Sequence, residues 1–179
     1  MQKINVKRLT FMSMLAAVSV VLVYLIRFPI FPSAPFLEYD PADIPLILGT
    51  FLYGPLWGLL LTAVVCVVQG VTVSVQSGIY GIIMHFASSG SYVLLAGLIY
   101  KYKKTSGGSL IAMTAGIAVS CTVMVLLNII ITPIFMGAPR SVVLEMILPV
   151  ILPFNLIKST ANSIIAFIVF KAAGRYFDV

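Results

Sequence analysis

The sequence predicts an all-α integral membrane protein, a single domain over residues 1–179 that folds as a bundle of six membrane-spanning helices. Apolar residues make up 61% of the chain and charged residues only 9%, whereas an average soluble domain has ~45–50% apolar and ~25% charged residues. So few charges cannot cover a water-soluble surface, and the apolar surplus must face lipid. The formal charge of +6 comes from basic residues at the ends of apolar runs, and this position argues against nucleic-acid binding.

The first predicted span runs from about Leu9 to Phe28, because a spanning helix needs ~20 mainly apolar residues. This run is too long for a signal peptide and has no small-residue cleavage site. A proline-rich acidic segment, residues 29–42, follows it. We therefore expect a membrane helix followed by a polar loop.

The next apolar run, Ile44 to Val73, is interrupted by Gly54-Pro55. Proline after glycine is typical of a turn or a helix start, so we expect a short helix to about Tyr53 and a longer one from Pro55. The short helix has too few residues to cross a full bilayer unless it is tilted or shielded by its neighbours. Three further spans are predicted at about Gly81–Tyr100, Leu110–Met136 and Leu148–Lys171.

Positive charge gives the orientation of the bundle, because cytoplasmic loops carry an excess of Lys and Arg. With six spans, both termini lie on one side of the membrane. That side collects most of the basic residues, namely Lys3, Lys7, Arg8, Lys101, Lys103, Lys104, Lys171 and Arg175. The other side holds Arg27, Arg140, Glu38, Asp40, Asp43 and Glu145. We therefore expect a multi-pass cell-membrane protein with both termini in the cytoplasm.

One charge lies outside these end clusters, Lys158, about ten residues into the last span. A charge near the bilayer centre costs ~2.5–3.5 kcal/mol on insertion scales, and such residues usually face the bundle interior and serve a ligand or a pathway. Asn155, Lys158 and Asn162 are spaced i, i+3 and i+7, so they share one helical face. Because no acid lies deep within a span, we expect Lys158 to lack a protein counter-ion and to be free for a ligand acceptor.

Further polar residues fall at a similar depth. Asn128 and Thr132 are four residues apart on the preceding span, and His85 lies near the outer end of the 81–100 span. We expect these groups to form a pocket open to the outside, over which the acidic 29–42 loop closes. The aromatic residues that flank this region are Phe36, Tyr39, Phe86, Phe135 and Phe154.

The chemistry of this pocket suits a neutral ligand. Two carboxamides and one ammonium offer both donors and acceptors, and apolar walls favour a flat heteroaromatic ring with carbonyl groups. A phosphate-rich ligand would require more than one Arg or Lys. No resident cofactor or metal is expected, because metal-ligand clusters and CxxC spacing are absent. The two cysteines, Cys66 and Cys121, lie in apolar runs as small buried hydrophobes.

Two other interpretations remain open. Asn residues in membrane helices often hydrogen-bond between helices, so the chain can be a structural membrane protein without a ligand. Alternatively, His85 and Ser88 or Ser89 have a spacing that permits contact, as in an intramembrane hydrolase. The signatures GxSxG, HExxH and GxxxxGK[ST] are all absent, so we expect neither enzyme activity nor ATP hydrolysis by this chain.

The first span carries a candidate contact face for a partner helix. Ser13 and Ala17 form a small-xxx-small pair that Ala16 widens, and small residues let helix backbones approach closely. The inverted repeats that are common in self-sufficient secondary transporters are not visible. A binding subunit that takes its energy from partner subunits is therefore the better prediction.

Several segments resemble the substrate-binding S components of energy-coupling factor (ECF) transporters, most closely the riboflavin-specific ones. These segments are FLEYDPADIPLILGTFLYGP at 36–55, GLIYKYKKT at 97–105, NIIITPIFMG at 128–137 and LPFNLIKS at 152–159. The resemblance spans nearly the whole chain, and PFNLIK is its most specific part. It implies a six-helix fold that captures a vitamin from outside for ATP-driven import.

The resemblance also implies roles for particular residues. Asn128, Asn155 and Lys158 would hydrogen-bond the isoalloxazine ring of riboflavin. The loop that would cover the ligand contains Leu37, Glu38, Tyr39 and Asp40. The face made by Ser13, Ala16 and Ala17 would meet the transmembrane coupling subunit, which carries two ATPase subunits. FMN, pantothenate or folate is the alternative cargo of such a subunit.

Overall fold

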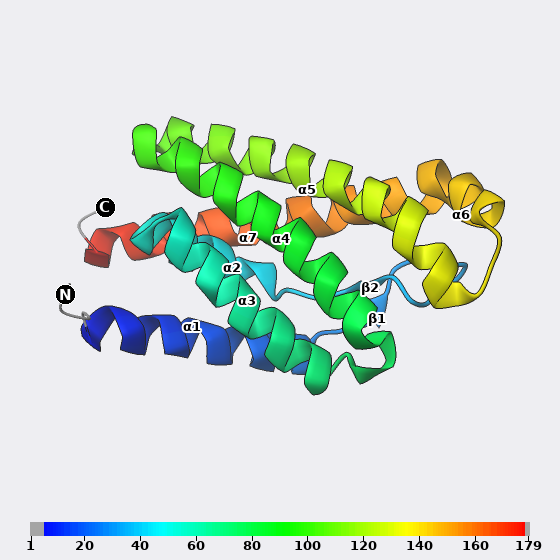
Figure 1. Ribbon diagram of the computed structural model, residues 1–179. Helices are drawn as coiled ribbons and strands as arrows, with labels where there is room; N and C mark the ends of the chain where they lie inside the picture. Colours follow the sequence, from blue (N-terminus) through cyan, green and yellow to red (C-terminus); the bar gives the residue numbers. More distant parts are fainter. Residues whose placement is uncertain (1–5, 178–179) are drawn as a thin grey trace.

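The computed structural model describes residues 6–177 of the chain, with side chains described up to residue 172. Helices of different lengths lie side by side in one elongated bundle (Figure 1). They are α1 (Val6–Leu25), α2 (Asp43–Tyr53), α3 (Pro55–Val71), α4 (Gly78–Tyr102), α5 (Ser106–Met136), α6 (Arg140–Met146) and α7 (Leu152–Phe177). A 3-10 turn, η1 (Val75–Ser77), precedes α4, and a π-helical turn, η2 (Ile147–Ile151), joins α6 to α7. The predicted all-helical class is confirmed.

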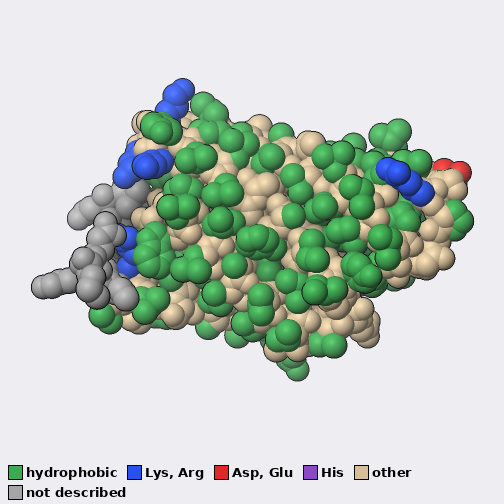
Figure 2. Space-filling view, in the orientation of Figure 1, with side chains coloured by type: hydrophobic (Ala, Val, Ile, Leu, Met, Phe, Trp, Pro, Cys, Tyr) green, Lys and Arg blue, Asp and Glu red, His purple; other side chains and the backbone are tan. Residues whose placement is uncertain are grey.

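Four helical segments of the described chain are long and apolar enough to cross a membrane, namely Val6–Leu25, Val75–Tyr102, Ser106–Met136 and Arg140–Ala172. The shorter apolar helices α2 and α3 accompany them. Large apolar side chains such as Leu56, Ile134 and Leu148 are exposed, and apolar side chains are spread over the visible face of the molecule (Figure 2). An exposed apolar surface of this extent fits contact with lipid.

The predicted break between α2 and α3 is confirmed at Gly54-Pro55. Gly54 has φ +95°, a conformation that glycine adopts without a steric penalty, and its N–H donates to the Thr50 carbonyl (2.8 Å). Pro55 stands in the first turn of α3, where its missing N–H would have had no helical partner. The chain therefore ends one helix and starts another within two residues.

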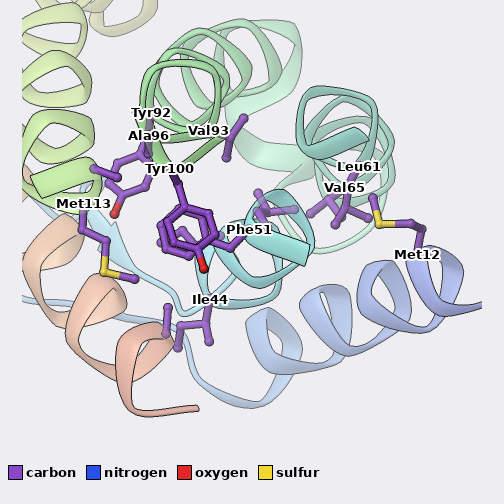
Figure 3. Close-up of a cluster of buried hydrophobic side chains, with 14 residues drawn as sticks. Met12, Ile44, Phe51, Leu61, Val65, Tyr92, Val93, Ala96, Tyr100 and Met113 are labelled. Carbon is purple, nitrogen blue, oxygen red and sulfur yellow. The ribbon is translucent and has the colours of Figure 1, made fainter. Parts of the chain in front are cut away.

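The main apolar core lies toward the end of the bundle that holds both termini. Phe51 of α2 stacks on Tyr100 of α4 (centroids 4.5 Å apart), and Phe170 of α7 meets both rings edge-on. Figure 3 shows Phe51 and Tyr100 at the centre of this cluster, with Met113 of α5 on one side and Ile44 beside them. Aromatic packing thus joins α2, α4 and α7 at this end.

Basic side chains gather at the same end of the molecule. Figure 2 shows Lys and Arg near the termini, and Arg140 and Glu145 of the described chain belong to α6 at the opposite end in Figure 1. Lys101, Lys103 and Lys104 are exposed beyond or at the end of α4. The predicted charge asymmetry is therefore present in the fold; its members Lys3 and the Arg175 side chain lie outside the described residues.

Two features of the fold differ from the sequence prediction. The 29–42 segment, expected as an acidic loop that closes over the pocket, contributes to a small antiparallel ladder of β1 (Phe28–Pro29) and β2 (Glu38–Tyr39). The separate helix α6 and the turn η2 were also not predicted. A second buried apolar cluster holds these elements together and consists of Ala34, Leu37, Val143, Val150, Ile151 and Phe154. The loop is therefore packed onto the bundle.

A close helix approach at Gly97 gives a first testable prediction. A Cβ atom at this position would lie 2.9 Å from the Pro55 Cα and 2.7 Å from the Thr50 Cγ2, so Gly97→Ala must push α4 away from the α2–α3 junction. We expect the free energy of unfolding to fall by ~1–3 kcal/mol, the usual cost of overpacking. Gly107→Ala is the matched control, because a Cβ there meets nothing within 4 Å. Equal melting temperatures in detergent for the two variants would contradict this packing.

Candidate ligand-binding site

A large cavity opens toward the end of the bundle away from the termini. Its walls come from the 27–43 segment, the last turns of α3, η1, the first half of α4, the end of α5 and the start of α7. Its interior holds about 160 Å³ of free space, and it opens to the surface between these elements. Phe36, Phe135 and Phe154 line it, whereas Phe86 does not. Aromatic walls thus surround a polar interior.

The structure brings nearly all of the predicted ligand contacts to this cavity. The lining includes Leu37, Glu38, Asp40, His85, Asn128, Thr132, Asn155 and Lys158. Tyr39 lies outside the lining. Its ring packs against Phe28 (centroids 5.4 Å apart), and its hydroxyl donates to Asn162 Oδ1 (2.9 Å). Burial, and next the charge of Asp40, raise the pKa of the Tyr39 hydroxyl, which keeps it a hydrogen-bond donor. Ligand contact by the lining residues stays a prediction.

Both candidate amides are held by their own helices. Asn128 Nδ2 donates to the Met124 carbonyl (2.8 Å), and the Thr132 hydroxyl donates to Asn128 Oδ1 (2.8 Å). Asn155 Nδ2 donates to the Ile151 carbonyl (2.7 Å). A primary amide has two N–H donors and an oxygen with two lone pairs. Each amide is therefore oriented by the protein and keeps capacity for a ligand.

The backbone before Asn155 is unusual. The Leu152 N–H donates to the Ile147 carbonyl, the i→i+5 pattern of a π-helix, which is frequent at functional sites. Pro149 and Pro153 lie four residues apart here, and a proline in a regular helix clashes with the carbonyl four residues before it. The wider turn accommodates these prolines, and it provides the Ile151 carbonyl that holds Asn155.

The prediction that Lys158 lacks a counter-ion is wrong. Lys158 Nζ lies 2.7 Å from Asp40 Oδ2, and the other oxygen of Asp40 accepts from the Ala42 N–H (3.1 Å). Asp40 belongs to the loop before α2, and this loop enters the bundle. No predicted span contains an acidic residue near Lys158, but the fold places the Asp40 carboxylate at the depth of Lys158.

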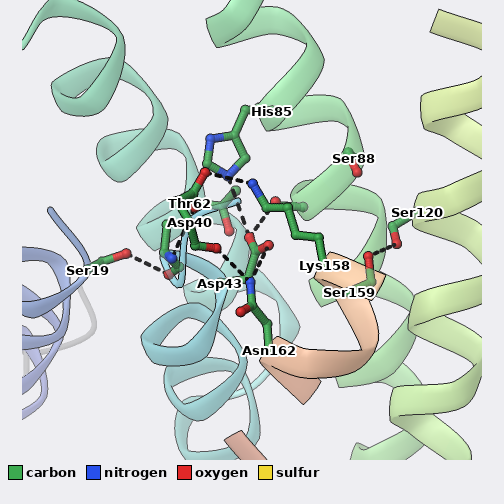
Figure 4. A network of polar contacts seen from close by, with 12 residues as sticks. Ser19, Asp40, Asp43, Thr62, His85, Ser88, Ser120, Lys158, Ser159 and Asn162 are labelled. Carbon is green, nitrogen blue, oxygen red and sulfur yellow. Dashed lines mark hydrogen bonds and ion pairs between the residues drawn. The ribbon is translucent and has the colours of Figure 1, made fainter. Parts of the chain in front are cut away.

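Asn162 ties the same loop to α7. It is fully buried, its Nδ2 donates to the Asp40 carbonyl (3.0 Å), and its oxygen accepts from the Tyr39 hydroxyl. A second, longer contact reaches Asp43 Oδ2 (3.4 Å). Figure 4 shows Asp40, Asp43, Lys158 and Asn162 converging between α2 and α7. Asn162 is thus hydrogen-bonded to the loop and does not line the cavity, which favours the interpretation that this asparagine joins segments of the protein.

Asp43 and His85 form a neighbouring cluster. Ser89 Oγ donates to Asp43 Oδ1 (2.6 Å), and His85 Nε2 lies 3.5 Å from the same oxygen. In the described part of the chain, no hydrogen bond joins His85 to Ser88 or Ser89 through their hydroxyls. Ser89 is therefore engaged with the carboxylate, and the Ser–His pair that a hydrolase requires is not formed.

Arg27 closes the edge of the cavity. Its Nε donates to Glu38 Oε2 (2.6 Å), and its guanidinium also contacts the Val73 carbonyl after α3. The contact links the end of α1, the β1–β2 ladder and the end of α3. Charge-assisted hydrogen bonds of this kind fix geometry as well as add energy. This clamp was not predicted, because nothing in the sequence pairs Arg27 with Glu38 or Val73.

Several other lining residues were not predicted. Asp43, Cys66 and Gln69 line the cavity, and among the described residues no group of three or more His, Cys, Asp or Glu side chains is arranged to hold a metal ion. Asp43 follows Asp40 in the DPAD stretch, a signal that could have suggested a second acid. Gln69 sits in an apolar run, where a polar residue is itself a signal of a site.

The predicted partner face on α1 is partly exposed. Ser13 and Ala17 are exposed, and Ser13 Oγ donates to the Leu9 carbonyl (3.0 Å) within its own helix. Ala16 packs against the buried core cluster instead. The accessible small-residue pair on α1 is therefore Ser13 and Ala17.

A protein family, two curated proteins and a solved structure match this chain over most of its length. A family model described as "ECF transporter, substrate-specific component" matches residues 7–170. The chain is 29% identical over 175 residues to the riboflavin transporter FmnP of Bacillus subtilis (strain 168), covering 93% of this chain and 91% of that protein. It is 28% identical over 176 residues to the riboflavin transporter RibU of Staphylococcus aureus (strain TCH60), covering 95% and 92%. A solved structure of the S component of a bacterial ECF transporter matches with a TM-score of 0.82 and 28% identity, covering 97% and 98%.

Proposed function

Because this chain belongs to the family of substrate-specific components of ECF transporters, we propose that it captures riboflavin at the outer face of the cell membrane for import. Membership makes it a transport component rather than an enzyme. Both similar curated proteins are riboflavin transporters. The single observation that carries the choice of ligand is the cavity itself, in which two oriented amides and one ammonium meet aromatic walls.

Riboflavin has a flat isoalloxazine ring with carbonyl and N–H edges, which matches the groups that this cavity offers. In the proposal, Asn128, Asn155 and Lys158 hydrogen-bond the ring edge, and Thr132 keeps Asn128 in position (2.8 Å). Leu37, Glu38 and Asp40 cover the ligand from the loop, and His85 contacts it from α4. Tyr39 supports the loop through Asn162. Riboflavin is the transported cargo, and no resident cofactor or metal takes part.

The proposed topology has six spans, with α2 and α3 as shortened helices shielded by their neighbours. The whole chain, residues 1–179, acts as one membrane domain. Lysines at the end that holds the termini support cytoplasmic termini by the positive-inside rule. The cavity then opens to the outside, where the vitamin is captured.

Transport requires a source of energy that this chain lacks. We infer that a transmembrane coupling subunit and two ATPase subunits provide it. The exposed Ser13 and Ala17 on α1 support a contact with the coupling subunit, because small side chains let another helix approach closely. Membrane lipid covers the remaining apolar surface.

The test is a binding measurement on the purified protein in detergent. We expect quenching of riboflavin fluorescence on titration, and flavin absorbance if the ligand co-purifies. A thermal-shift panel with riboflavin, FMN, pantothenate and folate identifies the preferred cargo, with riboflavin expected to give the largest stabilisation. A colourless protein that neither quenches riboflavin nor is stabilised by any vitamin would overturn the proposal and favour a structural role.

Removal of one amide gives a sharper test. Asn155→Leu keeps the branching and the number of side-chain heavy atoms of asparagine but removes the donor and the acceptor, and we expect riboflavin affinity to fall by ~10–100-fold, the value of one or two hydrogen bonds in a buried site. Leu156→Val is the matched control, because Leu156 is 43% exposed on the outside of the same helix. Isothermal titration or fluorescence quenching measures both. Unchanged affinity for Asn155→Leu would remove this residue from the site.

A further inference from the structure

Two buried polar atoms in the cavity wall have no hydrogen-bond partner among the described residues. They are Gln69 Oε1 of α3 and His85 Nε2 of α4. Gln69 is only 5% exposed, and His85 Nε2 is 3.5 Å from Asp43 Oδ1, beyond the usual range for an N–H···O bond. Buried polar groups are nearly always paired in native proteins. Both residues line the cavity, so a group that enters the cavity is the natural partner.

Gln69 and His85 belong to a wall with its own chemistry. The polar residues that line the cavity from the stretch 66–89 include Gln69, Ser74, Ser77, His85 and Ser88, and no Lys, Arg, Asp or Glu of this stretch lines it. We call this the hydroxyl-binding wall. The wall formed by α5 and α7 differs, because it carries Asn128, Asn155 and Lys158.

Hydroxyls, amides and imidazoles are each able to donate and accept hydrogen bonds. A chain of alcohol groups has the same dual character, whereas a phosphate requires cations or several donors. The hydroxyl-binding wall therefore matches a neutral polyol better than an anion. The ring-edge groups of α5 and α7 match the carbonyls of a flat heterocycle.

We propose that Gln69, together with His85, binds the polyhydroxylated side chain of the ligand and thereby sets its specificity. This inference rests on the proposed binding of riboflavin. The five-carbon chain of riboflavin supplies donors to Gln69 Oε1 and a partner to His85 Nε2.

The experiment compares riboflavin with lumiflavin, which has the same ring but a methyl group in place of the hydroxylated chain. Wild-type protein is expected to bind riboflavin at least tenfold more tightly than lumiflavin. Gln69→Leu is expected to weaken riboflavin binding by about tenfold and to leave lumiflavin affinity within about twofold. Val68→Leu is the matched control, because Val68 is 37% exposed and does not line the cavity. Fluorescence quenching of either flavin gives the affinities.

The outcomes separate this inference from the proposed function. Failure of the wild type to bind either flavin overturns the proposed function. If the wild type binds riboflavin, two results for Gln69→Leu overturn the role of Gln69. The variant loses affinity for riboflavin and lumiflavin equally, or it loses affinity for neither. If Gln69→Leu does not fold, the wild-type affinities for the two flavins still test the proposal. Equal affinity for riboflavin and lumiflavin excludes a hydroxyl-binding wall.

Discussion

Replacement of Lys158 by methionine is expected to abolish measurable riboflavin binding and to lower the free energy of unfolding by ~3–5 kcal/mol, the usual cost of leaving one partner of a buried ion pair alone. Lys158 is paired with Asp40 at 2.7 Å, and both side chains are mostly buried. Methionine fills the space of the aliphatic stem but offers no charge. The variant therefore loses the proposed ligand contact and leaves the Asp40 carboxylate without its cation.

The double variant Asp40→Asn/Lys158→Met separates these two effects. With both charges removed, most of the lost stability is expected to return, because replacing a whole buried pair is often close to neutral. Riboflavin binding is not expected to return, since the ammonium is still missing. Thermal unfolding and flavin titration of the wild type, single and double variants measure this. Full binding by the double variant would limit Lys158 to a structural role.

The second large effect is expected at Asn162. Asn162→Leu removes the donor to the Asp40 carbonyl and the acceptor of the Tyr39 hydroxyl, so one buried and one half-buried polar group lose their partner. Each unsatisfied group costs ~1–3 kcal/mol, and we expect a loss of ~2–4 kcal/mol in the free energy of unfolding. Riboflavin affinity should fall with it, because the loop that covers the cavity is held through these bonds. Chemical or thermal unfolding in detergent provides the measurement.

A double-mutant cycle with Tyr39→Phe tests the cause. Tyr39→Phe removes the hydroxyl that Asn162 would leave unpaired, so the double variant should be more stable than the sum of the single losses predicts. Ile164→Leu, at a side chain that is 55% exposed on the same helix, should change stability by less than ~0.5 kcal/mol. Strict additivity of Tyr39→Phe and Asn162→Leu would mean that the hydrogen bond between them contributes nothing.

Local rules predicted the helices well. A helix-starting proline after glycine placed the break between α2 and α3 at the correct residues, because Gly54 has positive φ and Pro55 needs no N–H partner. The π-helical turn and α6 could not be predicted in this way. Their geometry depends on packing against the loop cluster around Val143 and Ile151, which is a tertiary effect.

The parts of the site that follow from helical periodicity could be predicted from the sequence. The parts that depend on the path of the loop could not. Asn128 with Thr132, and Asn155 with Lys158, share faces that the sequence spacing gives directly. Asp40, the partner of Lys158, lies 118 positions away in sequence. It belongs to a loop without a helical or strand periodicity from which its path could be predicted. Asp40 was expected in the loop that closes over the pocket, but its pairing with Lys158 was not predicted, because only the fold carries this loop into the bundle.

The π-helical turn at Ile147–Ile151 has a consequence for insertions and deletions. Each i→i+5 bond encloses one residue more than a regular helix does, so the turn stores one surplus residue directly before Asn155. Loss of a single codon within this stretch would restore the regular pattern and rotate α6 by about 100° relative to α7. Lys158 would keep its place on α7, whereas the Asn155 amide would lose the present position of the Ile151 carbonyl that orients it. A one-codon gap in this turn would thus reshape the entrance and disturb one of the two amides that line the cavity.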